Sequence, residues 1–391
     1  MPTMFKRLTR DYLESLIGFA TDLLGILPGF ILAWSISYLS TNPWLLTLYP
    51  GILTVRGCLA GIASGRLSTG LHLGVINPSF RKVTREYVLI FNSMLFIVFF
   101  SSSILSLSIY VVNIMLGVET PSPLNIFWFA STVMGLSLIL VFPVTSFIGF
   151  TTFKRGIDPD LVLYPISSSV ADTGATLIFA FLAMGFKDFT MVYILTSSAL
   201  MIPALYTFVK YFSDEDFRLM LVQTMAALTL VAVISNVSGQ ALRGIYEIIR
   251  GRGSIYVMYP VLIDWVGDAS SMIGSRLTTK LALGDVRNFR DATIASISTG
   301  ASILASSATM LVLPAILVSL LVNDSPLKIY IISNMAVSMA MIPIFLLATT
   351  MPYYLFRYRL NPDNFINPIS SAIADSLTTI TLLTSLILLQ Y

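Results

Sequence analysis

The chain consists of long apolar stretches separated by short polar loops. A helix needs about 20 apolar residues to cross the hydrocarbon core of a bilayer. Each stretch of that length predicts a spanning helix, and these lie at about 12–39, 45–75, 87–117, 125–152, 161–184, 189–212, 219–249, 255–284, 292–322, 327–352 and 365–389. We therefore predict an all-α polytopic membrane protein with about 11 transmembrane helices.

Polar residues inside these stretches form a pattern that occurs twice. The first copy contains Tyr49-Pro50, Gly57 and Arg66-Leu67-Ser68-Thr69, and at an offset of 210 residues the second contains Tyr259-Pro260, Gly267 and Arg276-Leu277-Thr278-Thr279. Another pair follows, in which Pro165, Ser168 and Asp172 return as Pro368, Ser371 and Asp375. A period near 200 residues is too long for a solenoid repeat. The chain therefore contains a duplicated domain.

The duplicated motifs fall on the second and fifth helices of each half, which predicts a 5 + 1 + 5 arrangement. The expected domains are a first five-helix repeat at 1–186, a connecting transmembrane helix within 187–215 and a second repeat at 216–391. Because five helices end on the opposite side of the membrane from their start, the extra helix restores the orientation of the second copy. The repeats are then parallel, related by a pseudo-two-fold axis along the membrane normal. Such a fusion mimics a homodimer and allows a monomer to function.

The composition agrees with a membrane location. Of 391 residues, 56% are hydrophobic and only 11% are charged, whereas soluble domains carry about 25% charged residues. The lipid bilayer must therefore cover much of the surface. The net charge of +3 comes from basic residues in loops rather than a patch, which argues against nucleic acid as a partner. One cysteine and one histidine exclude a thiolate zinc site and a His-based metal cluster, and no cofactor is expected.

Loop charges predict the orientation of the chain. With the N-terminus inside, fourteen Lys and Arg residues lie in inner segments and four in outer segments. Basic residues concentrate on the cytoplasmic side of membrane proteins. We therefore expect a multi-pass protein of the cell membrane with a cytoplasmic N-terminus and an external C-terminus.

Acidic and hydroxyl side chains inside the apolar stretches are the candidate functional residues. Two oxygen-bearing stripes have i, i+4, i+8 spacing, which puts each on one helical face: Ser168, Asp172 and Thr176, and Ser371, Asp375 and Thr379. Asp172 lies about eleven residues into its helix, roughly 16 Å along it and close to the membrane midplane. Acids at that depth are costly and usually line a pathway. As an alternative, each aspartate caps a helix that is broken behind Pro165 or Pro368.

The second helix of the second repeat adds two more acids, Asp264 and Asp268, one turn apart. Asp22 in the first helix could serve the same pathway or pair with a buried arginine such as Arg66. Buried opposite charges generally pair, so Arg56 is expected to neutralise Asp264 or Asp268.

The donor set of the candidate site favours a hard cation. Close carboxylates repel one another, and a cation or a shared proton removes the conflict. Magnesium prefers oxygen donors and keeps several waters, although calcium, manganese and sodium fit the same chemistry. The predicted metal-site residues are Asp172, Asp375, Ser168, Ser371, Asp264 and Asp268.

At these residues the chain resembles the membrane domain of the MgtE magnesium channels and of the eukaryotic solute-carrier magnesium transporters, which carry two such domains in tandem. The run 63–69, Ala-Ser-Gly-Arg-Leu-Ser-Thr, is similar to the second-helix signature, and Pro-x-x-Ser-x-x-x-Asp to the fifth-helix motif. In that motif the aspartate faces the pore and holds hydrated magnesium, so the resemblance implies this role for Asp172 and Asp375.

Two departures from the family pattern bear on selectivity and regulation. The second-helix signature usually has Gly-Asn where this chain has Gly57-Cys58 and Gly267-Asp268. The MgtE channels also carry a cytoplasmic sensor ahead of the membrane domain, whereas about eleven residues precede the first helix here, so we do not expect sensing by that module.

The leading interpretation is a divalent-cation transporter or channel, with magnesium preferred, rather than an enzyme. A sodium- or proton-coupled magnesium exchanger is an alternative with the same residues. An intramembrane aspartyl protease would also use two buried aspartates, but its Tyr-Asp and Gly-x-Gly-Asp motifs are absent from the sequence. A membrane scaffold without transport activity is a further alternative.

Overall fold

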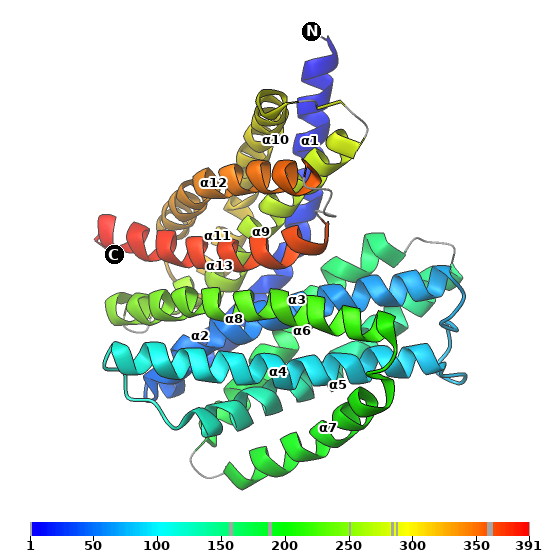
Figure 1. The fold of residues 1–391 in the computed structure, drawn as a ribbon. Helices are drawn as coiled ribbons and strands as arrows, with labels where there is room; N and C mark the ends of the chain where they lie inside the picture. The colour runs from blue at the N-terminus through cyan, green and yellow to red at the C-terminus, as the bar shows by residue number, and fades with distance from the viewer. Residues whose placement is uncertain are drawn as a thin grey trace. The chain divides into compact units, whose positions relative to one another are not determined.

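The computed structural model describes residues 2–155, 159–186, 190–249, 252–282, 285–286, 288–357 and 363–390. All regular secondary structure in these ranges is helical (Figure 1). In chain order the elements are α1 (Pro2–Asp22), the 3-10 turn η1 (Leu23–Gly25), α2 (Ile26–Leu39), α3 (Pro43–His72), α4 (Arg85–Met115), α5 (Pro123–Lys154), α6 (Pro159–Met184), α7 (Thr190–Tyr211), α8 (Glu215–Ile249), α9 (Gly253–Ala282), α10 (Phe289–Met310), α11 (Val312–Val322), α12 (Pro326–Arg357) and α13 (Asp363–Leu388).

Nine helical segments within the described ranges are long and apolar enough to cross a membrane. They coincide with nine of the eleven predicted stretches, and the other two correspond to α6 and α9. The apolar part of α6, Ser168–Met184, is shorter, and α9 contains Asp264 and Asp268, which lower its hydropathy. The prediction of an all-α membrane protein is confirmed, whereas the count of eleven in a 5 + 1 + 5 arrangement stays a prediction.

The helices form two compact units, and the first of these is discontinuous in sequence. Unit 1 comprises Met1–Ile36 and Val237–Tyr391, and unit 2 comprises Ser37–Asn236. The units group helices that contact one another, whereas the predicted repeats group helices by sequence duplication. The boundaries of the units therefore differ from those of the repeats. The repeat boundaries at 186 and 215 stay a prediction that rests on the sequence duplication.

In unit 2, α3 packs against α4, α5 and α6. The contacts are both aromatic and polar. The ring of Trp44 on α3 meets the edge of Phe129 on α5, with 5.7 Å between ring centroids. The side-chain amide of Asn113 donates a hydrogen bond to Thr47 Oγ1 at 3.0 Å. Such bonds satisfy polar groups that would be unpaired in a hydrocarbon environment, and they hold α3 at the centre of its unit.

In unit 1, α1 packs against α9 and α10, and α9 also packs against α12 and α13. Glycines allow the closest approach. A Cβ atom at Gly29 of α2 would overlap the backbone carbonyl of Val257 on α9, and one at Gly25 would crowd Val261. The first membrane segment therefore lies directly against the backbone of α9.

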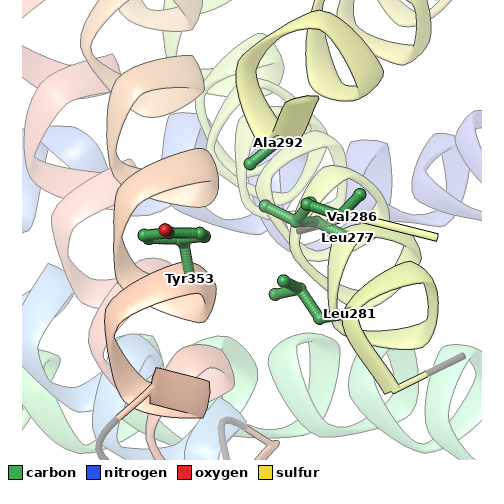
Figure 2. Packing of buried hydrophobic residues seen from close by; sticks show 5 residues of the cluster. All are labelled: Leu277, Leu281, Val286, Ala292 and Tyr353. Atoms are coloured by element: carbon green, nitrogen blue, oxygen red, sulfur yellow. The ribbon is translucent and has the colours of Figure 1, made fainter. Parts of the chain in front are cut away.

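The end of α9 is fixed by a small apolar cluster (Figure 2). Leu277 and Leu281 of α9 pack with Val286, with Ala292 of α10 and with Tyr353 of α12. All five side chains are at most 9% exposed. This cluster ties three helices of unit 1 together beyond the acidic residues of α9.

Candidate cation-binding site

Asp172 is buried on α6, in the stripe that the sequence analysis identified. Its side chain is 7% exposed, and Ser168 Oγ, one turn earlier, donates a hydrogen bond to Asp172 Oδ2 at 3.5 Å. One turn later, Thr176 Oγ1 lies 3.0 Å from the hydroxyl of Tyr49 on α3. The stripe therefore faces the second helix of its own half where the duplicated tyrosine lies.

Arg56 provides a positive charge beside Asp172. Its side chain is 4% exposed, and one guanidinium nitrogen donates to Ser137 Oγ at 2.5 Å and to the carbonyl oxygen of Ala171 at 2.7 Å. Its charge interacts with that of Asp172. Three helices, α3, α5 and α6, therefore contribute to this charged group.

The sequence analysis expected Arg56 to pair with Asp264 or Asp268. In the structure the acidic neighbour of Arg56 is Asp172. The spacing along α3 explains this. Arg56 lies seven residues after Tyr49, on the same face of the helix two turns later. Since Tyr49 contacts α6, a side chain on that face also meets α6.

The second half repeats the tyrosine–threonine contact. Asp375 on α13 is 7% exposed, and the hydroxyl of Thr379, one turn later, donates to the backbone carbonyl of Asp375 at 2.6 Å. Thr379 Oγ1 lies 3.2 Å from the hydroxyl of Tyr259 on α9. The residue aligned with the first-half arginine is Val266, which is fully buried. The two halves therefore share a scaffold but differ in charge.

The structure brings Asp264 and Asp268 of α9 close to Asp22. The carboxyl groups of Asp22 and Asp268 lie within hydrogen-bonding reach of one another, and the charge of Asp264 also acts on Asp22. Asp22 is 7% exposed and lies at the last residue of α1. Because Asp22 is a single charge in an apolar stretch, the sequence identified it as a candidate functional residue. The sequence did not identify α9 as its neighbour.

The second helices have open space beside equivalent glycines. A Cβ atom built at Gly57 of α3 or at Gly267 of α9 would meet no atom within 4 Å. These glycines are 210 residues apart, the offset of the duplicated motif. Hydrated magnesium needs such space because it keeps several of its waters.

Within the described ranges, no group of three or more His, Cys, Asp or Glu side chains could hold a metal ion. A hydrated ion requires only one or two carboxylates together with water. The buried aspartates fit that mode of binding better than a closed cage of ligands. The roles of Ser168, Ser371 and the four predicted acids stay a prediction.

Comparisons with known proteins give one match. No curated protein and no solved structure matched the chain. The family model MgtE, described as divalent cation transporter, matches residues 49–182 and 259–385, about two thirds of the chain. Each matched segment starts at the tyrosine of the duplicated motif and ends beyond the buried aspartate of the fifth helix. The chain therefore belongs to the MgtE family of divalent cation transporters, and the family domain occurs in it twice.

Proposed function

We propose that the protein carries Mg²⁺ across the cell membrane through a pathway lined by α3 and α6 of the first repeat and α9 and α13 of the second. Asp172 and Asp375 are the main cation-binding groups of this pathway, with Ser168 and Ser371 beside them. The observation that carries the proposal is the duplicated site, in which a buried aspartate lies one turn from a threonine that contacts the tyrosine of the second helix.

The chemistry of the site supports magnesium among the divalent ions. The acids and hydroxyls offer oxygen donors only, and hard cations prefer oxygen. The open space beside Gly57 and Gly267 suits an ion that keeps its water. Asp264 and Asp268 add negative charge in the second repeat, which raises the local concentration of cations.

The arrangement of the repeats is part of the proposal. With the N-terminus in the cytoplasm and the repeats parallel, the two fifth helices come from equivalent places around one axis. A cysteine scan with a membrane-impermeant reagent tests the orientation. Labelling of Phe289→Cys, the exposed first residue of α10, from the cytoplasmic side agrees with the proposed topology, whereas labelling only from outside contradicts it.

Magnesium flux into liposomes tests the transport assignment. Purified protein is reconstituted, and a magnesium-sensitive dye reports uptake by the parent, Asp172→Asn, Asp375→Asn and the double variant. Asparagine keeps the size of the side chain but removes the charge, and charge acts most strongly where water screens it least. Each single variant is expected to reduce uptake sharply, and the double variant to abolish it.

A matched control uses Asp285, which is exposed between α9 and α10. Because water and salt screen an exposed charge, Asp285→Asn should transport at the parent rate. Runs with and without a sodium or proton gradient separate passive flow from coupled exchange. If both single variants at the fifth helices transport like the parent, those aspartates are structural and the proposed pathway is wrong.

A further inference from the structure

We propose that Asp22 of α1 and Asp268 of α9, with Asp264 one turn away, form a second divalent-cation site inside unit 1. Its ligands are other side chains than the fifth-helix aspartates. The proposal rests on the proposed function only for the identity of the ion, because the arrangement of the acids follows from the structure of this unit alone.

An unsatisfied oxygen marks the site. Asp22 is 7% exposed, and its Oδ2 atom is buried without a hydrogen-bond donor. The side chains within hydrogen-bonding reach of Asp22 are the hydroxyl of Thr21 and the carboxyl of Asp268, and the carboxyl offers only acceptors when it is ionised. Asp22 is buried and Asp268 is half-buried, and two carboxylates in contact repel unless a shared proton or a cation lies between them. A cation between the two groups supplies that charge.

Arg276, a basic residue of α9, does not supply the positive charge between the two carboxyl groups. Arg276 lies eight residues after Asp268 and on the same helical face. Its guanidinium is already held by Asp11 at 2.9 Å and by Glu14 at 2.7 Å, both on α1. The charges that act on Asp22 come from Asp264 and Asp268, which are both acids.

The packing around Asp22 holds the carboxyl groups in place. Phe19, one turn before Asp22, stacks on Trp265 of α9 with 4.6 Å between ring centroids. The indole nitrogen of Trp265 donates to Ser307 Oγ of α10 at 2.9 Å. Because Trp265 lies between the two acids of α9 in sequence, this contact fixes α1 and α9 together at the site.

The geometry suits a hydrated divalent ion. Magnesium binds through one or two carboxylates and completes its shell with water, so the two acids in contact are sufficient ligands and Asp264 adds charge. The first repeat has Thr54 and Cys58 at the positions aligned with the two acids of α9. The first repeat therefore lacks the two acids that α9 contributes to the second site.

Binding of Mn²⁺ to the purified full chain tests the proposal, because Mn²⁺ shares the oxygen chemistry of Mg²⁺ and is detected by its paramagnetic spectrum. The background is the double variant Asp172→Asn with Asp375→Asn, which lacks both fifth-helix carboxylates. We expect this background to retain one class of bound Mn²⁺. Adding Asp22→Asn should remove that class or weaken it at least tenfold, while adding Asp285→Asn should leave it unchanged.

Asp268→Cys is a second test in case Asp22→Asn does not fold. Cysteine is chosen because Cys58 occupies the aligned position of the first repeat. Thermal unfolding without metal identifies which variants are folded. If folded Asp22→Asn and Asp268→Cys proteins both bind Mn²⁺ as the background does, the second site does not exist. Magnesium flux through the background variant at the parent rate would refute the proposed pathway. The Mn²⁺ measurement would still show whether the second site exists.

Discussion

Arg56 places a fixed positive charge beside a proposed magnesium ligand, and its replacement by glutamine tests whether that charge weakens ion binding. The guanidinium is buried and bonded to Ser137 and to the carbonyl of Ala171. Glutamine keeps an amide donor that can serve these acceptors but carries no charge. Arg56→Gln therefore changes the electrostatics of Asp172 more than the packing of α3.

The size of the effect follows from Coulomb's law. A hydrated divalent ion at Asp172 would lie about 6 Å from the guanidinium, where repulsion is about 1.4 kcal/mol in bulk water and about 5.5 kcal/mol at an effective dielectric constant of 20. The lower value corresponds to about tenfold in affinity. Because Arg56 is only 4% exposed, screening is weaker than in bulk water. Removing the charge should therefore strengthen binding by at least about tenfold.

Magnesium uptake into liposomes, measured over a range of Mg²⁺ concentrations, gives the half-saturating concentration. We expect it to fall at least about tenfold in Arg56→Gln and to stay at the parent value in Arg56→Lys, which keeps the charge. Removing one partner of a buried charge pair costs about 3–5 kcal/mol of stability, so uptake is compared for equal amounts of folded protein. An unchanged or higher half-saturating concentration in folded Arg56→Gln would show that the guanidinium serves packing alone.

Three further predictions follow from the differences and contacts described above. Asp375→Asn should reduce magnesium uptake more than Asp172→Asn, because an arginine already offsets the charge of Asp172; equal losses would contradict this asymmetry. Tyr259→Phe removes the hydroxyl that contacts a buried threonine and should lower the free energy of unfolding by about 1 kcal/mol, measured by denaturation in detergent, with little change in uptake. Gly29→Ala should destabilise the protein by about 1–3 kcal/mol, because its methyl group overlaps a backbone carbonyl; Gly57→Ala, inside α3 and facing open space, is the control and should be neutral or stabilising by up to about 1 kcal/mol.

The sequence was sufficient for those features that repeat along the chain. The constant offset of the duplicated motifs predicted two copies of one domain, and the matched family segments start at the same two tyrosines. The four-residue spacing predicted that Ser168 and Asp172 share a helical face, and their side chains are bonded. Spacing within one helix fixes a face, and a duplication fixes an alignment, so these two kinds of inference need no tertiary structure.

Contacts between different helices could not be predicted in the same way. The neighbours of Arg56 and Asp22 depend on which helices pack together, and periodicity does not carry that information. Hydropathy was also less decisive for α9, the helix with the candidate acids Asp264 and Asp268. The polar residues that identify a functional helix are the same residues that weaken its signal as a membrane span.

The grouping of α1 with helices from the far end of the chain has a consequence for how the protein is made. Tyr12 of α1 donates a hydrogen bond to Thr309 of α10, across 297 residues of sequence. At a synthesis rate of about 5–20 residues per second, α1 is made roughly 15–60 s before α10. During that interval the first helix is in the membrane without its partners, and the carboxyl of Asp22 has no neighbour from α9. During insertion, α1 must therefore stay in the membrane with an unpaired Asp22 carboxyl until the last helices of its unit have been made.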